Sequence, residues 1–189
     1  MNLPLRCKCG RIRGTITNTS RCFRLVCYCK DCQAYARSLG QEDVLDAAGG
    51  TDITQLPPAH ITITEGIDLL RCLSLSNRVL RWYAHCCRSP IANTASVPYF
   101  PLVGVIHSFM DVSDQSKDAA LGPARWRLFE ESATGPLPLD APPPASVGVF
   151  AQRVASILGW WMLGLARPTP FFVEGSNTPR SRPRGQSET

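Results

Sequence analysis

The stretch VCYCKDCQ, residues 26–33, places Cys27, Cys29 and Cys32 within six positions. The run RLVCY that leads into it has β-branched and aromatic residues and predicts a strand. The run DCQAYARSLG that continues from it has helix formers, an acidic N-cap and a glycine stop. We therefore expect these three residues, the thiol triplet, to lie where a strand gives way to a short helix.

Two further cysteine groups stand apart from the triplet: CKC, with Cys7 and Cys9, and HCC, with His85, Cys86 and Cys87. Side chains alternate along an extended segment, so a C-x-C pair points both sulfurs to the same side. Zinc prefers four ligands in a tetrahedron, and thiolate is its preferred structural ligand. The first pair must therefore borrow ligands from far along the chain, and Cys86 and Cys87 are the expected donors for a structural zinc.

Metal binding explains nine cysteines better than disulfides do. The segment MNLPLRCKCG has no apolar core of a signal peptide, so we expect a cytoplasmic protein in a reducing compartment. With 44% hydrophobic residues the chain can bury a core without disulfides. A thioredoxin-type interpretation of CKDC lacks a βαβ context and leaves Cys27 unexplained. Clustered cysteines in such a chain predict metal sites.

The thiol triplet supplies three ligands locally and shows no obvious fourth. Three protein ligands and an open position are typical of catalytic zinc, which can bind a substrate thiol as thiolate or polarise a carbonyl. The alternative is a closed structural site, with Cys22, His85 or His107 as the fourth ligand. We therefore predict two zinc ions as cofactors, one structural and a second of the catalytic type.

The motifs CKCGRIRG, CYCKDCQ and CCRSPIANT resemble those of the glutathione-dependent formaldehyde-activating enzyme family, which is also known from centromere-protein-V-like domains. The resemblance covers roughly residues 5–110. It implies a small zinc-bearing β fold of the β-tent kind. It also implies a structural zinc on the C-x-C pair and the late cysteine pair, and a catalytic-type zinc on the triplet.

The late motif departs from the family pattern C-x-x-C-G-S-P. Aligning CRSP with it puts Cys87 on the second late ligand and leaves Ala84 where the first is expected. Arg88 also replaces the usual glycine. Cys86 or His85 must then substitute, and adjacent cysteines reach one metal only if the backbone turns sharply. The chain therefore looks like an offshoot of the family.

Short strand-like runs separated by turn signals predict a mainly β fold of antiparallel strands with a C-terminal α-helix. We expect a zinc-binding β domain over residues 1–134 and a Pro-rich linker, GPLPLDAPPPAS, over 135–146. A helix and docking segment should follow over 147–173, and a basic disordered tail over 174–189.

The predicted helix VGVFAQRVASILGWWMLGLA ends before Pro168. One face repeats apolar residues at helical spacing: Phe150, Val154, Ile157, Leu158, Trp161 and Leu165. We expect this stripe to dock on the β domain or on a partner. Contact with a membrane surface through Trp160 and Trp161 is the less favoured alternative, and the apolar part is too short for a transmembrane span.

Other candidate sites are weaker. The net charge of +5 is modest and no basic stripe alternates with aromatics, so no nucleic-acid partner is expected. Motifs for phosphate cradles and nucleophile elbows are absent from the sequence. Cys22 and Cys72 are interpreted as core thiols, His60 as a surface residue at the start of a strand, and His107 as a core histidine.

Two hypotheses of function follow. The first is a zinc-dependent carbon–sulfur lyase of the formaldehyde-activating type, which acts on a thiol adduct of an aldehyde, such as a glutathione-type hemithioacetal. The alternative is a non-catalytic, zinc-stabilised binding module whose C-terminal helix docks a partner or a membrane surface. A fixed fourth protein ligand on the triplet favours the second, whereas an exchangeable position favours the first.

Overall fold

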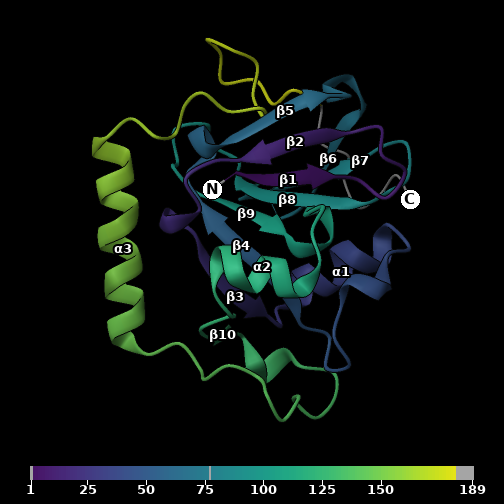
Figure 1. The fold of residues 1–189 in the computed structure, drawn as a ribbon, viewed down its shortest axis with the longest axis vertical. Coiled ribbons are helices and arrows are strands. Elements are labelled where there is room, and N and C mark those ends of the chain that lie inside the picture. The colour runs from purple at the N-terminus through teal and green to yellow at the C-terminus, as the bar shows by residue number, and fades with distance from the viewer. Residues whose placement is uncertain (1, 77, 182–189) are drawn as a thin grey trace.

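The computed structural model describes residues 2–76 and 78–181 of the chain, and most of its regular structure is strand (Figure 1). The predicted mainly β class with a C-terminal helix is confirmed. The strands are β1 (Leu3–Arg6), β2 (Arg13–Ile16), β3 (Phe23–Cys27), β4 (Thr51–Leu56), β5 (Ile61–Glu65), β6 (Leu70–Ser76), β7 (Val79–Ala84), β8 (Pro90–Ala95), β9 (Val103–Ile106) and β10 (Arg127–Leu128). The helices are α1 (Lys30–Ser38), α2 (Asp114–Leu121) and α3 (Val147–Met162).

The strands form two sheets. A three-stranded sheet has the order β1-β2-β5, and a seven-stranded sheet has the order β10-β3-β4-β9-β8-β7-β6. Neighbours in both are antiparallel except β10 and β3, which run parallel. Short 3₁₀ turns connect the elements: η1 (Thr19–Arg21), η2 (Glu42–Val44), η3 (Pro58–His60), η4 (Ile67–Leu69), η5 (His107–Phe109) and η6 (Glu130–Ser132).

The main core includes side chains from both sheets. Trp82 of β7 is fully buried in it, and its Nε1 donates a hydrogen bond to Thr94 Oγ1 at 2.9 Å. Phe171 and Phe172 pack on the Trp82 ring with centroid separations of 5.2 and 6.3 Å. Because these residues follow α3, the segment after that helix belongs to the core of the β structure.

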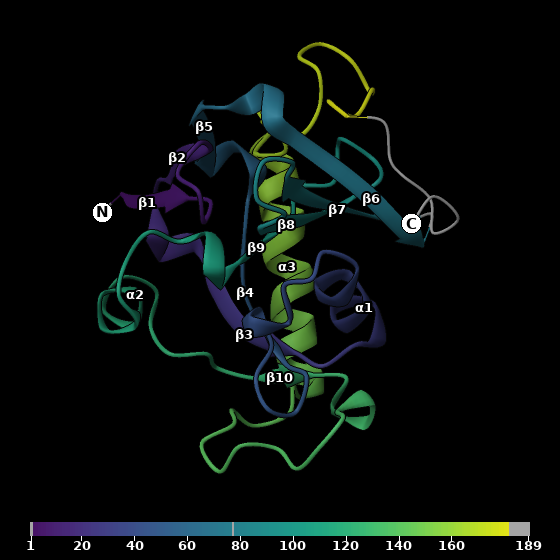
Figure 2. The ribbon, with the colours of Figure 1, turned by 90° about the vertical axis from the view of Figure 1, so that its right-hand side faces the viewer.

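A second core lies between α1 and the seven-stranded sheet. Its buried members are Leu25, Cys27, Cys32, Tyr35, Leu39, Ile53, Tyr83 and Ile106. The Tyr35 hydroxyl donates to the Trp82 carbonyl and accepts the Ile91 N–H at 3.3 Å. These bonds fix α1 against β7 and β8. Helix α2 lies on the opposite flank of the molecule from α1 (Figure 2). The first turn of α1 therefore faces β7.

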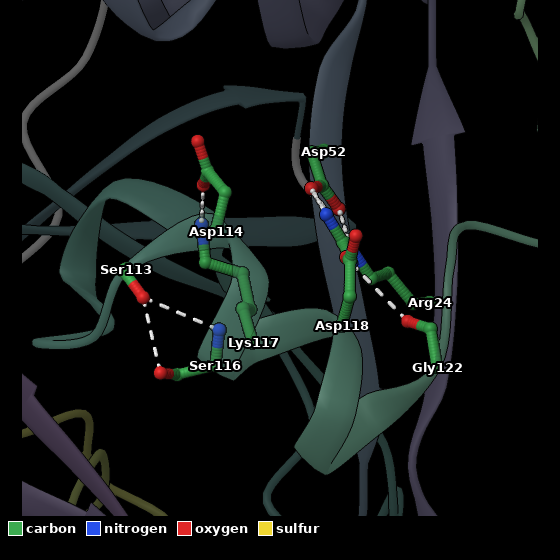
Figure 3. Close-up of polar contacts among 8 residues, drawn as sticks. All are labelled: Arg24, Asp52, Ser113, Asp114, Ser116, Lys117, Asp118 and Gly122. Atoms are coloured by element: carbon green, nitrogen blue, oxygen red, sulfur yellow. Dashed lines mark hydrogen bonds and ion pairs between the residues drawn. The ribbon is translucent and has the colours of Figure 1, made fainter.

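Helix α2 begins where the sequence predicts only a loop. Ser113 caps its first turn by accepting the Ser116 N–H at 3.3 Å. The guanidinium of Arg24 on β3 joins Asp52 on β4 to Asp118 on α2, and it also donates to the Gly122 carbonyl at 3.2 Å (Figure 3). This ion-pair network fixes the helix to the sheet.

Several local predictions need revision. The runs AHITITEG and DLLRCLSLS predict two strands joined across Gly66, and the structure has both, β5 and β6, in different sheets. Gly66 adopts φ 69°, and a Cβ there would lie 2.2 Å from the Arg11 carbonyl oxygen. This close approach lets the chain pass from one sheet to the other. Strands β1 and β8 are also missed by the sequence patterns, and His60 lies in η3, one residue before β5.

Most of the apolar stripe predicted to dock α3 is exposed. Phe150, Val154, Leu158 and Trp161 are 53–62% exposed, whereas Arg153 and Trp160 are the buried residues of the helix. The Arg153 guanidinium lies 3.8 Å from the ring centroid of Phe23, so an aromatic contact decides which face turns inward. The helix does dock on the β structure, through a face that lies beside the predicted stripe and shares the half-buried Ile157 with it.

Residues 174–181 of the predicted tail are described, and they form a turn in which Val173 N–H donates to the Thr178 carbonyl at 2.9 Å. Residues 182–189 of that tail lie outside the described part of the chain. Within the described part, no helix combines the length and hydrophobicity needed to cross a bilayer.

Candidate metal centres

The thiol triplet lies at the junction of β3 and α1. Cys27 ends β3, Cys29 is the N-cap of α1, and Cys32 lies in the first helical turn. The three sulfurs lie within 4.8 Å of one another, with 3.7 Å between those of Cys32 and Cys27. Cys29 Sγ accepts the Cys32 N–H at 3.4 Å, so the cap bond turns that sulfur toward the helix. The strand end and the first turn thus bring three thiols together.

The triplet favours the thiolate at its middle member. Hydrogen bonds from the thiols of Cys27 and Cys32 hold the pKa of Cys29 well below its usual range. The hydrogen bond to Cys29, together with burial, raises the pKa of Cys27. One sulfur therefore becomes negative first, and a cation is needed before all three can ionise together.

None of the three fourth ligands considered for the triplet joins it. Among the described residues the cluster contains the three cysteines alone. His85 is exposed and its backbone N–H donates to the Leu69 carbonyl at 2.9 Å. Cys22 packs against the main core, and His107 lines a separate cavity with Asp52. The protein side chains described here thus leave one position of a tetrahedron to another ligand.

Arg81 is a site residue that the sequence analysis does not find. It is 4% exposed on β7, and its Nη1 lies 3.6 Å from Cys32 Sγ and 3.2 Å from Asn93 Oδ1. Its Nη2 is 3.5 Å from a carboxylate oxygen of Asp31, and its guanidinium lies 5.6 Å from the Tyr35 ring centroid. A buried cation next to a thiol cluster offsets the negative charge of the thiolates. The only trace in the sequence is an arginine inside the apolar run RVLRWYA.

The second cluster joins Cys7, Cys9, Cys86 and Cys87, whose sulfurs also lie within 4.8 Å of one another. The measured separations are 3.6 Å for Cys7–Cys9, 3.9 Å for Cys7–Cys86, 3.2 Å for Cys9–Cys86 and 3.9 Å for Cys86–Cys87. Zn–S bonds of about 2.3 Å in a tetrahedron put sulfurs about 3.8 Å apart. The four donors therefore match a closed zinc–thiolate site in both number and spacing.

A sharp turn between β7 and β8 allows both adjacent cysteines to join this cluster. Arg88, at the position where the family pattern has glycine, adopts φ 58° in the left-handed region. Its N–H donates to the Ala84 carbonyl at 2.8 Å, which closes the turn. Ala84 itself is fully buried at the end of β7, and Cys86 stands in the cluster in its place. His85, the other candidate, does not belong to the group.

Backbone and hydroxyl donors surround this four-cysteine cluster. The Ile12 N–H donates to Cys7 Sγ at 3.3 Å, and Cys87 Sγ lies 3.1 Å from Ser89 Oγ. Although burial opposes it, hydrogen bonds from Ser89 and Cys9 lower the pKa of Cys87 to about 6. Burial raises the pKa of Cys7. N–H groups directed at sulfur are the supporting contacts that thiolate ligands need.

The two clusters differ in their surroundings. The Cys27 and Cys32 side chains line a cavity of ≈ 270 Å³ on the seven-stranded sheet. The four-cysteine cluster lies at a strand end and a turn, with Cys9 exposed. The remaining thiols are separate, because Cys22 packs on the core and Cys72 Sγ donates to the Ser181 carbonyl at 3.1 Å. Both clusters are compatible with zinc, and the triplet adjoins a cavity.

Comparison with known proteins gives a family and a distant structure. The sequence model of a family described as a family of unknown function (DUF6151) matches residues 1–180. No curated protein matches the chain. A crystal structure of a Rhodobacter sphaeroides protein is similar, with 16% sequence identity and a TM-score of 0.41, over 62% of this chain and 94% of that one. The family match spans both cysteine clusters and α3.

Proposed function

The chain belongs to this family of unknown function (DUF6151), and we propose that it is a zinc protein with a structural and a reactive site. The reactive site, on the thiol triplet, would make or break a carbon–sulfur bond in a thiol adduct of an aldehyde. The supporting observation is the contrast between four clustered sulfurs at a turn and three that adjoin a cavity. The resemblance of the three motifs to the formaldehyde-activating family supports the same assignment.

The proposed chemistry is the formation or splitting of a hemithioacetal. A thiolate sulfur attacks the aldehyde carbon, a C–S bond forms, and the carbonyl oxygen takes up a proton; the reverse reaction splits the adduct. Zinc held by the triplet, with one position open, would bind the substrate sulfur as thiolate and lower the pKa of its thiol. Cys27, Cys29 and Cys32 are the residues that would hold it.

Other residues of the chain would support this step. Three thiolates carry more negative charge than one divalent ion neutralises, and the buried Arg81 guanidinium next to Cys32 offsets the excess. The described residues that line the cavity include no His, Asp, Glu or Lys. The proton on the carbonyl oxygen would therefore come from solvent at the cavity mouth. Leu25 and Ile53 keep water away from the inner end.

A second function has its own supporting observation. The exposed stripe of α3 carries Phe150, Val154, Leu158 and Trp161, each more than half exposed. Large exposed apolar side chains on one face are typical of a binding surface. Under this alternative both metal clusters would be structural, and α3 would dock a partner or a membrane surface.

The experiment is a zinc count combined with an exchange assay. Zinc per chain is measured by mass spectrometry for wild type, Cys9→Ser, Cys29→Ser and the control Cys22→Ser, whose thiol belongs to neither cluster. Exchange between benzyl mercaptan, formaldehyde and their hemithioacetal is then followed by NMR. We expect one zinc for each cluster in wild type and in the control. Cys29→Ser should stay folded, lose one zinc and lose the acceleration of exchange.

Other outcomes decide against parts of the proposal. A wild-type chain without stoichiometric zinc would contradict both functions. If Cys29→Ser unfolds the chain as fully as Cys9→Ser does, the division into reactive and structural sites is wrong. Full zinc loading without any acceleration of exchange would favour the binding module.

A further inference from the structure

The cavity beside the triplet has a chemical character of its own. Its volume of ≈ 270 Å³ lies just below the range of about 300–1,000 Å³ typical of small-molecule sites, so its occupant is small. It is lined by Leu25, Cys27, Cys32, Ile53, Arg81 and Phe129, among others. Two of the triplet sulfurs and one buried guanidinium thus face the same space.

The polar side of the cavity is cationic. Arg81 is 4% exposed and Arg78, at the same cavity, is exposed to solvent. The Nε–H of Arg81 is buried and donates to no acceptor among the described residues. The nearest carboxylate, Asp31, is 47% exposed and lies 3.5 Å from Nη2. A buried donor without a partner costs free energy, which an incoming acceptor would recover.

No described lining residue is Asp or Glu. An anion entering the cavity therefore meets two guanidinium groups, whereas an ammonium group would meet only like charges. The carboxylate is the acceptor that matches a guanidinium best, because two oxygens can accept two parallel N–H donors. The charge pattern selects a ligand with a negative group and no positive one.

The remaining wall combines the neutral polar side chains of Gln55, Asn93 and Thr94 with a larger set of apolar ones. Leu25 and Ile53 are buried beside the sulfurs, and Leu102 and Leu128 are half-buried further out. Phe129, 53% exposed, lies at the rim. The Asn93 and Thr94 side chains already accept hydrogen bonds from Arg81 and Trp82. Several peptide units, or an ammonium group, would therefore lie mostly against apolar side chains, which costs free energy. An apolar body, by contrast, gains from the same contacts.

We propose that the triplet cavity binds a small thiol that carries one carboxylate on an apolar body, rather than a peptide thiol such as glutathione. This inference rests on the proposed function, because the thiol sulfur would take the open position beside the triplet. The carboxylate would accept from Arg81, with Arg78 adding positive charge. The hydrocarbon body would fill the space between Leu25, Ile53 and Phe129.

Matched probes test the proposal on the zinc-loaded chain. Thiomandelate has a thiol, a carboxylate and a phenyl ring; benzyl mercaptan lacks the carboxylate and phenylacetate lacks the thiol. Isothermal titration calorimetry measures each affinity, and glutathione serves as the peptide thiol. We expect thiomandelate to bind about 10- to 100-fold more tightly than benzyl mercaptan, as a charge-assisted hydrogen bond predicts. Glutathione should bind more weakly than thiomandelate.

Variants separate the role of Arg81 from chelation of the metal by the probe's own carboxylate. In Arg81→Met the advantage of thiomandelate over benzyl mercaptan should disappear, while benzyl mercaptan keeps its affinity. Zinc content is measured in parallel, because Arg81 touches Cys32. Ala95→Phe, which fills the cavity from β8, should weaken both thiols and leave the zinc count unchanged.

The outcomes separate this inference from the proposed function. If neither thiol binds the zinc-loaded chain, the open reactive site is refuted and the inference falls with it. If both thiols bind equally, or glutathione binds best, the inference is refuted while the reactive site stands. An unchanged preference for thiomandelate in Arg81→Met would assign the carboxylate to the metal and overturn the role of Arg81.

Discussion

Two buried arginines on opposite sides of β3 give a sharp test of the packing. Arg153 of α3 is 8% exposed, and its Nε, Nη1 and Nη2 have no hydrogen-bond partner among the described residues. The guanidinium lies 3.8 Å from the ring centroid of Phe23 and 5.0 Å from that of Trp160. Burial lowers the pKa of Arg153 to about 10. We expect Arg153→Met to stabilise the protein.

The magnitude follows from two opposing contributions. Leaving a charged donor group without partners costs about 1–3 kcal/mol or more. The cation–π contacts return about 2 kcal/mol in a desolvated site. Methionine keeps the length and the aromatic contacts of the side chain without its charge. The net gain in the free energy of unfolding should be about 1 kcal/mol, which raises Tm by about 2–4 °C for a chain of this size.

Arg24 is the matched control because its guanidinium has partners. It is 11% exposed in its side chain, its Nη2 lies 2.7 Å from Asp52 Oδ2, and it also pairs with Asp118 (Figure 3). Arg24→Met leaves the Asp52 carboxylate without its cation. Breaking a fully buried pair costs about 3–5 kcal/mol, and the partial exposure here reduces the expected loss to about 2–4 kcal/mol.

Urea denaturation of the zinc-loaded proteins, followed by far-UV circular dichroism, measures both effects. The m-values must agree with wild type for the comparison to hold. The two variants should shift the midpoint in opposite directions. A loss of more than about 1 kcal/mol in Arg153→Met would refute the reasoning, because it would mean that the aromatic contacts outweigh the missing hydrogen bonds.

Three further predictions concern thiols, acid stability and packing. Burial raises the pKa of Cys22 and of Cys72 to about 12, so iodoacetamide at pH 8 should label them only after denaturation, as peptide mass spectrometry would show. Burial lowers the pKa of His107, so the neutral imidazole is favoured in the folded protein. The free energy of unfolding should therefore fall as pH drops below about 6.5, by at most ~1.4 kcal/mol per pH unit. The urea midpoints of His107→Leu should not show this pH dependence. A Cβ on Gly14 would lie 2.2 Å from the Thr62 carbonyl oxygen. Gly14→Ala should therefore lower the free energy of unfolding by about 1–3 kcal/mol in the same urea assay. Gly159→Ala is the control, because a Cβ there meets open space and should cause no loss of stability.

The local parts of both metal clusters could be predicted from sequence. Cys27, Cys29 and Cys32 lie within six positions, so a strand end and one helical turn suffice to bring their sulfurs together. The two-residue spacing also keeps Cys7 and Cys9 together, although they lie in a turn closed by the Gly10 N–H on the Cys7 carbonyl and not in the extended segment that the sequence predicted. Short-range geometry limits where such side chains can point, and spacing alone therefore carries the information.

The face of α3 that packs inward could not be predicted from periodicity. The periodicity singles out the stripe from Phe150 to Leu165 as the side to bury, yet the structure leaves most of that stripe exposed. Contact of Arg153 with Phe23 decides which side is buried, and that pairing joins residues 23 and 153 of the chain. Sequence reasoning also places a charged residue of an apolar helix on the solvent side, because charged side chains are seldom fully buried.

The sequence by itself determined the mainly β class, the thiol triplet and the first cysteine pair, because strand patterns and ligand spacings act over a few residues. The sequence also predicted Cys86 and Cys87 as partners of that pair, but only the tertiary structure shows how both adjacent cysteines reach it, through a turn that Arg88 closes in the left-handed region. It alone placed Arg81 beside Cys32 and shaped the cavity that both residues line. These features depend on which strands become neighbours, and packing of the whole chain decides that order.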